Sequence, residues 1–296
     1  MIAEREIQMF KLLPATISEL AEKLNIYPGT VSKITEKLIK NGLAKKQRKG
    51  KHVLITKEQT THAQKLEEII KTFSRLPLEK LLTHSNLTII ALLNYQLKPV
   101  EIQCITNVSR QWIYKTIKEL SRYGIILKKP KGYTINPIHQ PLQEFAKYYH
   151  EYNNYRYIST ISEDALIIWQ HGNEILFKTK KEITNKPTTA VTNFSNYNMP
   201  LISDTKYYYQ TNRTLNTSDT ILHTILIDPR SKTYNTYACL LIEKTNPPDL
   251  IKKAHLYNLT NHAQTLISFL KNKKIQESFL PTWEEYETLA KQYGVR

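Results

Sequence analysis

Residues 26–33 (IYPGTVSK) align with residues 108–115 (VSRQWIYK) when the chain is shifted against itself by 82 positions without a gap. The correspondence continues downstream and pairs Leu38 with Leu120, Lys40 with Arg122, Gly42 with Gly124, Leu43 with Ile125, Lys46 with Lys128 and Gly50 with Gly132. Each copy has the pattern of a helix, a tight turn, a second helix, a glycine stop and a basic hairpin. The sequence therefore predicts a repeated helix-turn-helix unit that binds DNA.

Positive charge is concentrated in the half of the chain that contains the repeat. The 296 residues carry a net charge of +16. Residues 1–140 hold 24 Lys and Arg against 11 Asp and Glu, a net of +13, whereas residues 141–296 hold 18 against 15, a net of +3. A general lysine bias would raise both halves equally. The asymmetry favours contact between the first half and a polyanion such as DNA.

The first copy predicts a reader helix that starts at Pro28 and stops at Gly42. The preceding helix, with Thr16 or Ser18 as its cap, positions it. Small, hydroxyl and basic residues on the outer face suit close approach to a major groove: Gly29, Thr30, Ser32, Lys33 and Lys37. The hairpin tip, residues 45–51, supplies the predicted phosphate contacts Lys45, Lys46, Arg48, Lys49 and Lys51.

The second copy predicts a reader helix with Ser109 as its N-cap. Its outward residues are Arg110, Gln111, Tyr114, Lys115 and Lys118, and its hairpin carries Lys128, Lys129 and Lys131. Arginine pairs bidentately with guanine and glutamine with adenine, so this copy is better suited to base reading than the first. Trp112 is more typical of a core or interface residue than of a base contact.

The two copies resemble the winged-helix regulators of archaea and bacteria over residues 8–57 and 85–136. Two features carry this resemblance: the serine-containing start of each reader helix, and the glycine-containing segments that follow the helices at residues 41–43 and 123–125. It implies a first winged helix in residues 1–60, a linker helix in 61–84 and a second winged helix in 85–140. The apolar stripe of the linker helix suits a rigid spacer or a dimer helix equally. Some winged helices bind only proteins, so DNA contact by both copies stays open.

Residues 141–296 predict a mixed α+β domain, so the whole chain is expected to be α+β. A connecting helix is followed by a hairpin around residues 171–173 and by strands at 206–210 and 234–242. Helices are predicted from the Ser218-Asp219 cap to Leu226, and over 249–257, 260–270 and 282–293. Residues 215–241 and 283–294 resemble archaeal regulators with an AbiEi-type antitoxin C-terminal region. That resemblance implies an autorepressor whose second half is related to nucleotidyltransferases.

The sequence argues against catalysis in this half. A working nucleotidyltransferase needs a Gly-Ser turn and paired carboxylates for Mg²⁺, and neither pattern is present. His223 is interpreted as a satisfied core or cap histidine, and Asp228 with Arg230 as a turn with a local ion pair. Two cysteines in apolar contexts, Cys104 and Cys239, show no metal-ligand spacing and no disulfide pattern. No metal or cofactor is therefore expected.

These observations predict a cytoplasmic, archaeal-type transcriptional regulator that binds double-stranded DNA in a sequence-specific manner. No signal peptide or transmembrane helix is expected, and hence no membrane partner. The C-terminal domain is assigned to dimerisation, ligand binding or partner binding, which leaves a homodimer or a toxin partner open. The alternatives are an antitoxin that represses its own operon, a replication or transcription initiation factor and, ranked last, a nucleic-acid-modifying enzyme.

Overall fold

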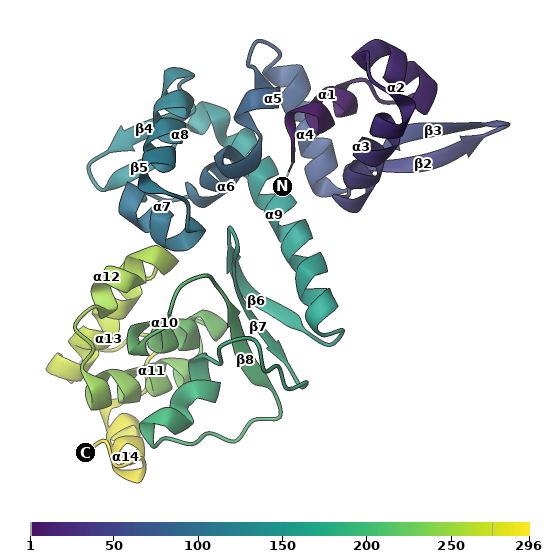
Figure 1. Cartoon of the computed structure of the whole chain (residues 1–296). Coiled ribbons are helices and arrows are strands. Elements are labelled where there is room, and N and C mark those ends of the chain that lie inside the picture. Colours follow the sequence, from purple (N-terminus) through teal and green to yellow (C-terminus); the bar gives the residue numbers. More distant parts are fainter. Residues whose placement is uncertain (1, 274) are drawn as a thin grey trace. The chain divides into compact units, whose positions relative to one another are not determined.

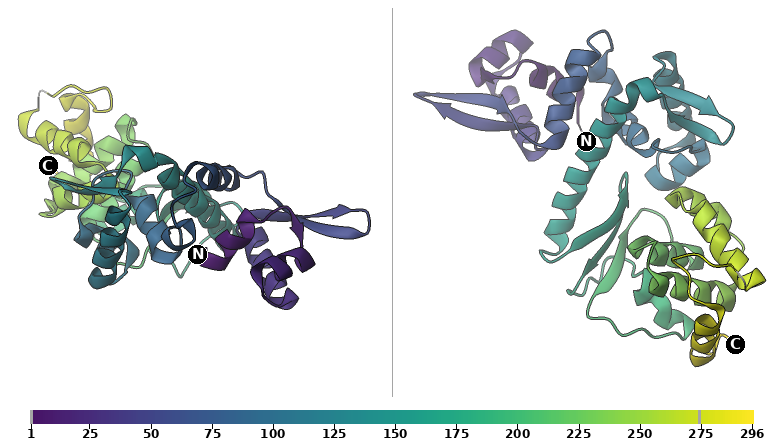
Figure 2. Two further views of the ribbon diagram at one scale, coloured as in Figure 1. Left: turned by 90° about the horizontal axis from the view of Figure 1, so that it is seen from above. Right: turned by 180° about the vertical axis from the view of Figure 1, so that it is seen from behind.

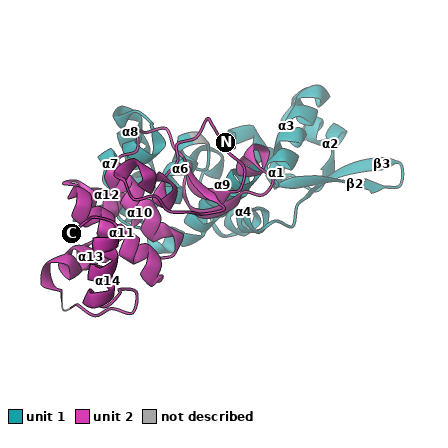
Figure 3. Cartoon of the chain, turned by 90° about the horizontal axis from the view of Figure 1, so that it is seen from below, with its two compact units in different colours: residues 1–156 teal, residues 157–296 magenta. Residues whose placement is uncertain are grey.

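The chain forms two compact units, residues 1–156 and residues 157–296, coloured separately in Figure 3. The structure is a computed structural model that describes residues 2–273 and 275–296. It contains helices and three small antiparallel sheets, so the predicted mixed α+β class is confirmed (Figure 1). No helix within the described residues is long and apolar enough to span a bilayer.

The first unit begins with three helices and a three-stranded sheet. Its elements are α1 (Glu4–Lys11), β1 (Ala15–Thr16), α2 (Ile17–Leu24), α3 (Pro28–Lys40), β2 (Ala44–Lys49) and β3 (His52–Lys57). The strand order is β1-β3-β2, with antiparallel pairing throughout. The side chain of Thr16 caps α2 in a capping box with Glu19, as the sequence allowed. Pro28 occupies the first turn of α3, where its missing N–H is not needed.

The second part of the first unit repeats this order of elements. After α4 (Thr61–Thr72) and α5 (Leu78–Leu81) come α6 (His84–Leu92), α7 (Pro99–Thr106), α8 (Arg110–Arg122), β4 (Ile126–Lys129) and β5 (Gly132–Ile135). Helices α7 and α8 begin and end 82 residues after α2 and α3. In place of β1, Leu97 forms a bridge to Tyr133.

The turn residues recur at the same offset as the helices. Asn25 and Asn107, which end α2 and α7, both adopt the left-handed conformation. Gly42 and Gly124, which follow α3 and α8, have φ of +67° and +69°. Asparagine and glycine tolerate this region because the steric conflict is small for them. The sequence repeat is therefore also a repeat of backbone conformation.

The second unit packs helices beside a three-stranded sheet (Figure 2). After the turn η1 (Pro137–His139), helix α9 (Gln140–Ile161) crosses the boundary between the units. Strands β6 (Leu166–His171), β7 (Glu174–Thr179) and β8 (Lys206–Gln210) form the sheet in sequence order. The remaining elements are η2 (Ala190–Tyr197), α10 (Thr217–Ile227), α11 (Lys232–Thr245), α12 (Leu250–Ala254), η3 (His255–Tyr257), α13 (Thr260–Asn272) and α14 (Trp283–Gln292).

Helix α10 forms the centre of this second unit. Its residues from Ser218 to Leu226 are all buried. The predicted hairpin and the strand at 206–210 are confirmed as β6, β7 and β8. The strand predicted at 234–242 is wrong, because these residues lie in helix α11. Ala238, Cys239 and Ile242 are buried at helical spacing and Ser231 caps the helix, which outweighs the β-propensity of the tyrosines and threonine.

Two further expectations are corrected. Asn216, not Ser218, caps α10, in a capping box with Asp219. Most of residues 45–51 belong to strand β2, because pairing with β3 continues to Lys49 and leaves only Gly50 and Lys51 at the tip. Of the two cysteines, Cys104 is exposed and Cys239 is buried.

A substitution at Gly132 tests the second hairpin. With φ of +147°, an added Cβ would lie 2.5 Å from the backbone of Leu97. Gly50 has φ of +62° but no heavy atom within 4 Å of the added Cβ. Gly132→Ala is therefore expected to lower the free energy of unfolding by about 1–3 kcal/mol more than Gly50→Ala does, because only the first change adds a steric clash. Urea unfolding of both variants measures the difference, and equal losses would contradict it.

Candidate nucleic-acid interface

The first reader helix, α3, has one buried face and one polar face. Its buried residues are Val31, Ile34, Thr35 and Leu38. On the other side, Gly29, Lys33 and Lys37 are exposed, and Thr30 and Ser32 are half-buried. An added Cβ at Gly29 would meet no atom within 4 Å, so the start of the helix is sterically open. The five predicted contact residues of α3 thus lie on its outer side, and three of them are exposed.

The first hairpin, β2–β3, carries four exposed cations. Lys46, Arg48, Lys49 and Lys51 are exposed. Lys45 differs, because it is half-buried and its Nζ lies 3.2 Å from a carboxylate oxygen of Glu58. No carboxylate within residues 2–273 or 275–296 forms an ion pair with the four exposed cations. Four uncompensated charges on one hairpin give it a positively charged surface.

The second reader helix, α8, exposes every residue predicted to contact DNA: Arg110, Gln111, Tyr114, Lys115 and Lys118. Ser109 caps it by accepting a hydrogen bond from the Trp112 amide. The Arg110 guanidinium lies over the ring of Tyr114, 5.6 Å from its centroid. The Lys115 ammonium lies 4.8 Å from the centroid of the Trp112 ring.

Trp112 is an exposed residue of α8 rather than part of the core. Its indole Nε1 donates a hydrogen bond to the hydroxyl of Ser85 on α6. This contact holds the ring at the surface of the repeat that contains it. Of the two positions expected for Trp112, the core position is wrong, because α8 buries Ile113, Thr116, Ile117 and Leu120 instead. The interface position stays a prediction.

The second hairpin, β4–β5, is shorter than the first. Its strands have four residues each, against six each in β2 and β3. Lys128, Lys129 and Lys131 are exposed on it. Both repeats therefore place a basic hairpin directly after a reader helix.

Contacts from α4, its N-cap Thr60 and α9 hold the backbone at the end of α3. The Nε2 atom of His62 on α4 lies 2.8 Å from the carbonyl oxygen of Asn41. Thr60 donates a hydrogen bond of 2.6 Å to the carbonyl of Gly42. The ring of Tyr152 on α9 packs where a Cβ on Gly42 would lie. Burial lowers the pKa of His62 despite the hydrogen bond to Asn41, so the ring stays neutral and packs among aromatic rings.

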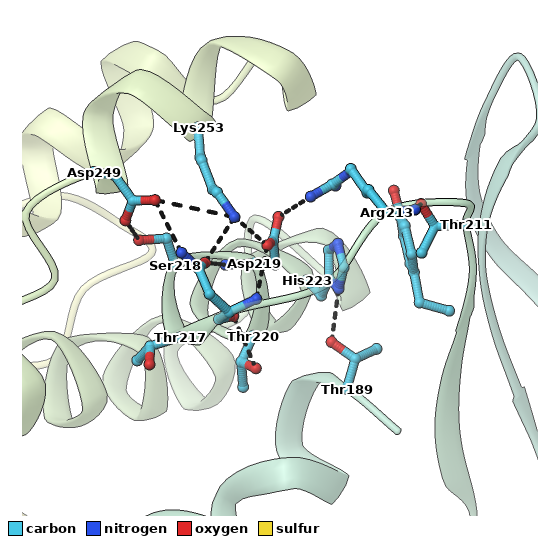
Figure 4. A network of polar contacts seen from close by, with 12 residues as sticks. Thr189, Thr211, Arg213, Thr217, Ser218, Asp219, Thr220, His223, Asp249 and Lys253 are labelled. Atoms are coloured by element: carbon cyan, nitrogen blue, oxygen red, sulfur yellow. Dashed lines mark hydrogen bonds and ion pairs between the residues drawn. The ribbon is translucent and has the colours of Figure 1, made fainter. Parts of the chain in front are cut away.

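The second unit contains a buried network of charged and polar residues, shown in Figure 4. Arg213 Nε lies 2.8 Å from a carboxylate oxygen of Glu174, and Arg213 Nη1 lies 2.6 Å from one of Asp219. Lys253 also contacts Asp219, and Asp249 lies 4.0 Å from Lys253. Asp219 is fully buried, so its charge requires these partners.

His223 extends this network toward the sheet. Its Nδ1 lies 2.6 Å from the Thr189 hydroxyl and its Nε2 lies 2.8 Å from the Tyr257 hydroxyl. Since Tyr257 donates to Asp219, His223 Nε2 carries the proton and Nδ1 accepts from Thr189. Burial holds the pKa of His223 at about 3. The interpretation of His223 as a satisfied core histidine agrees with these contacts.

Electrostatics in this network favour ionised Asp219 and neutral His223. Burial opposes ionisation of Asp219, but the cations Arg213 and Lys253 hold its pKa at about 2. Asp228, by contrast, accepts a hydrogen bond of 2.9 Å from the backbone amide of Arg230, which is a local turn. The described residues contain no group of three His, Cys, Asp or Glu that would hold a metal ion.

Sequence reasoning missed this network. Glu174, Arg213 and Lys253 lie far apart along the chain, and only the fold brings them to the N-terminal end of α10. The one local signal is the Asn216-Thr217-Ser218-Asp219 capping box, which marks the start of that helix.

Comparison with known proteins gives two partial matches. The MarR family matches residues 11–50, which span β1, α2, α3 and β2. This match indicates a winged-helix, DNA-binding transcriptional regulator. A family described as "HVO_2833_C, C-terminal" matches residues 185–295. No curated protein and no solved structure matches the chain significantly.

Replacing Arg213 tests the role of the buried network. Arg213→Leu leaves Glu174 and Asp219 without their shared cation, so the free energy of unfolding of the second unit is expected to fall by about 3–5 kcal/mol. The matched control is Lys206→Ala, which removes the exposed Lys206–Glu182 pair and is expected to have little effect. Urea unfolding compares them; a small loss for Arg213→Leu would show that the network contributes little.

The low pKa of His223 predicts acid sensitivity. The unfolded chain protonates this histidine near its ordinary pKa of 6.5, whereas the folded chain does so only near pH 3. The contribution of neutral His223 to the free energy of unfolding is therefore fully present above pH 6.5. It is lost as the pH drops toward 3, by up to about 1.4 kcal/mol per pH unit. His223→Gln is expected to flatten this dependence between pH 6 and 5, whereas His52→Gln on the exposed hairpin should not. If the stability of His223→Gln depends on pH in the same way as that of the parent, the low pKa assigned to His223 is wrong.

Proposed function

We propose that the protein is a sequence-specific transcriptional regulator that binds double-stranded DNA with two winged helices. The observation that carries the proposal is the pair of 13-residue helices α3 and α8, each with an exposed polar face and a following basic hairpin. Residues 1–60 and 85–140 are the two winged helices, and residues 61–84 connect them. The MarR match to residues 11–50 supports this role for the first.

The reader helices and hairpins divide the contacts between bases and backbone. Helix α3 enters the major groove by its open N-terminal end at Gly29, with Thr30 and Ser32 as hydrogen-bonding groups and Lys33 and Lys37 near phosphates. Arg110 and Gln111 of α8 read base edges, while Tyr114, Lys115 and Lys118 line the same surface. The hairpin cations at positions 45, 46, 48, 49 and 51, and at 128, 129 and 131, bind the sugar-phosphate backbone.

Residues 141–296 supply dimerisation, ligand sensing or partner binding in this proposal, without catalysis and without a cofactor. The buried network supports a structural role, because its carboxylates are paired with Arg213 and Lys253 rather than left open for a metal. The setting is the cytoplasm.

Sequencing of genomic DNA captured by the full chain separates the possible roles. Enrichment at its own promoter fits an autorepressor or antitoxin, enrichment at an origin fits an initiation factor, and no enrichment contradicts DNA reading.

Substitutions in the hairpins test the phosphate contacts. Arg48→Ala and Lys131→Ala are each expected to lower the slope of log affinity against log salt concentration by about one, because each removes one phosphate contact. Lys291→Ala, an exposed lysine on α14, is the control and should leave the slope unchanged. Fluorescence anisotropy across a salt series measures the slopes. If both hairpin variants keep the parental slope and affinity, the hairpins do not contact DNA.

Substitution of Arg110 tests base reading by α8. Arg110→Ala is expected to weaken binding to the preferred site by about 1–3 kcal/mol and binding to random duplex by less, because a bidentate base contact is specific. The preferred site comes from selection on random duplexes with the parent chain. Equal losses on both DNAs would show that Arg110 only holds phosphate.

A further inference from the structure

The two reader helices differ in aromatic surface. Trp112 and Tyr114 on α8 are each 44% exposed. Helix α3 contains no aromatic residue, and the residue before it is the N-cap Tyr27. Side chains two positions apart on a helix point about 200° apart. Trp112 and Tyr114 therefore flank the outward stripe of Gln111, Lys115 and Lys118 from opposite sides.

Each of these rings packs against a neighbouring cation. The indole of Trp112 is tied to Ser85 by its N–H, and the Lys115 ammonium lies over the ring. The Arg110 guanidinium lies over the Tyr114 ring and donates a hydrogen bond of 3.4 Å to its hydroxyl. Both cations belong to exposed, flexible side chains. They can leave the rings for a phosphate when another flat group takes their place.

Duplex DNA offers little to the faces of the two rings. In a duplex the faces of the bases are stacked on each other, and only their edges line the grooves. Bases that have left the stack present both faces, and they bind aromatic rings with adjacent cations for the phosphates. Larger residues at the start of α8, Gln111 and Trp112, also replace the small Gly29 and Thr30 that open α3 to a groove.

The hairpin after α8 is consistent with this difference. Each of its strands is two residues shorter than those of the first hairpin. At about 3.3 Å per residue, it extends roughly 7 Å less far toward a neighbouring groove. The second winged helix is therefore less suited than the first to contact along a duplex groove and more suited to a local contact.

We propose that the rings of Trp112 and Tyr114, on either side of the outward stripe of α8, bind unpaired DNA bases by stacking, beside the duplex segment held by α3. This inference rests on the proposed DNA binding by the first unit. Arg110 and Gln111 then contact the base edges, which an opened pair leaves accessible.

The test compares two DNAs at one salt concentration with the full chain. One is a fully paired duplex, and the other has the same sequence with a central run of mismatched thymines. The parent is expected to bind the mismatched DNA at least about fivefold more tightly for each base stacked. Trp112→Leu and Tyr114→Leu should each reduce this preference, because each weakens binding to the mismatched DNA by a larger factor than binding to the duplex. Tyr114→Phe should keep the preference, because it keeps the ring.

Tyr27→Leu is the matched control, since this tyrosine is 85% exposed on the other reader, and it should leave the ratio of the two affinities unchanged. A 2-aminopurine in the mismatched run should be quenched on binding by the parent and by Tyr114→Phe, and less by Tyr114→Leu. Equal affinity for both DNAs would overturn the stacking inference and leave the proposed function standing. Absence of binding to either DNA would overturn both.

Discussion

Burial of one apolar stripe along each reader helix is the constraint on which the rest of the first unit depends. Ile34 and Leu38 in α3, and Thr116 and Leu120 in α8, are fixed inward by packing against the preceding helices. Because a helix is rigid, the residues on the opposite side must then face outward. The position of the cations on both helices follows from the core and not from the cations themselves.

Charge is handled in opposite ways in the two units. In the first, the hairpin cations stay exposed and mostly without carboxylate partners, so their mutual repulsion is relieved when an anion binds. In the second, Arg213 and Lys253 are paired with Glu174 and Asp219 beneath the surface. The first arrangement suits reversible contact with a polyanion, and the second fixes β7 against α10 and α12.

The sequence predicted the first unit well because its signals are local. Proline at the start of α3, serine before α8 and glycines at the exits act on neighbouring residues, and the offset of 82 residues repeats them. The second unit was harder, since its central features depend on distant partners. The local sequence of residues 234–242 favours a strand, whereas packing places these residues in helix α11. No local pattern links Glu174 to Arg213. Sequence reasoning identified the outward cations, yet it missed how Ser85 holds Trp112 at the surface.

Hydroxyl-radical footprinting of the full chain on a selected DNA site tests the central proposal, that both repeats bind the same DNA. Two separate protected segments are expected. Combined replacement of Lys128, Lys129 and Lys131 by alanine should remove one, and replacement of Arg48, Lys49 and Lys51 should remove the other. A single protected segment that is lost with the first hairpin and unaffected by changes in the second would contradict tandem reading.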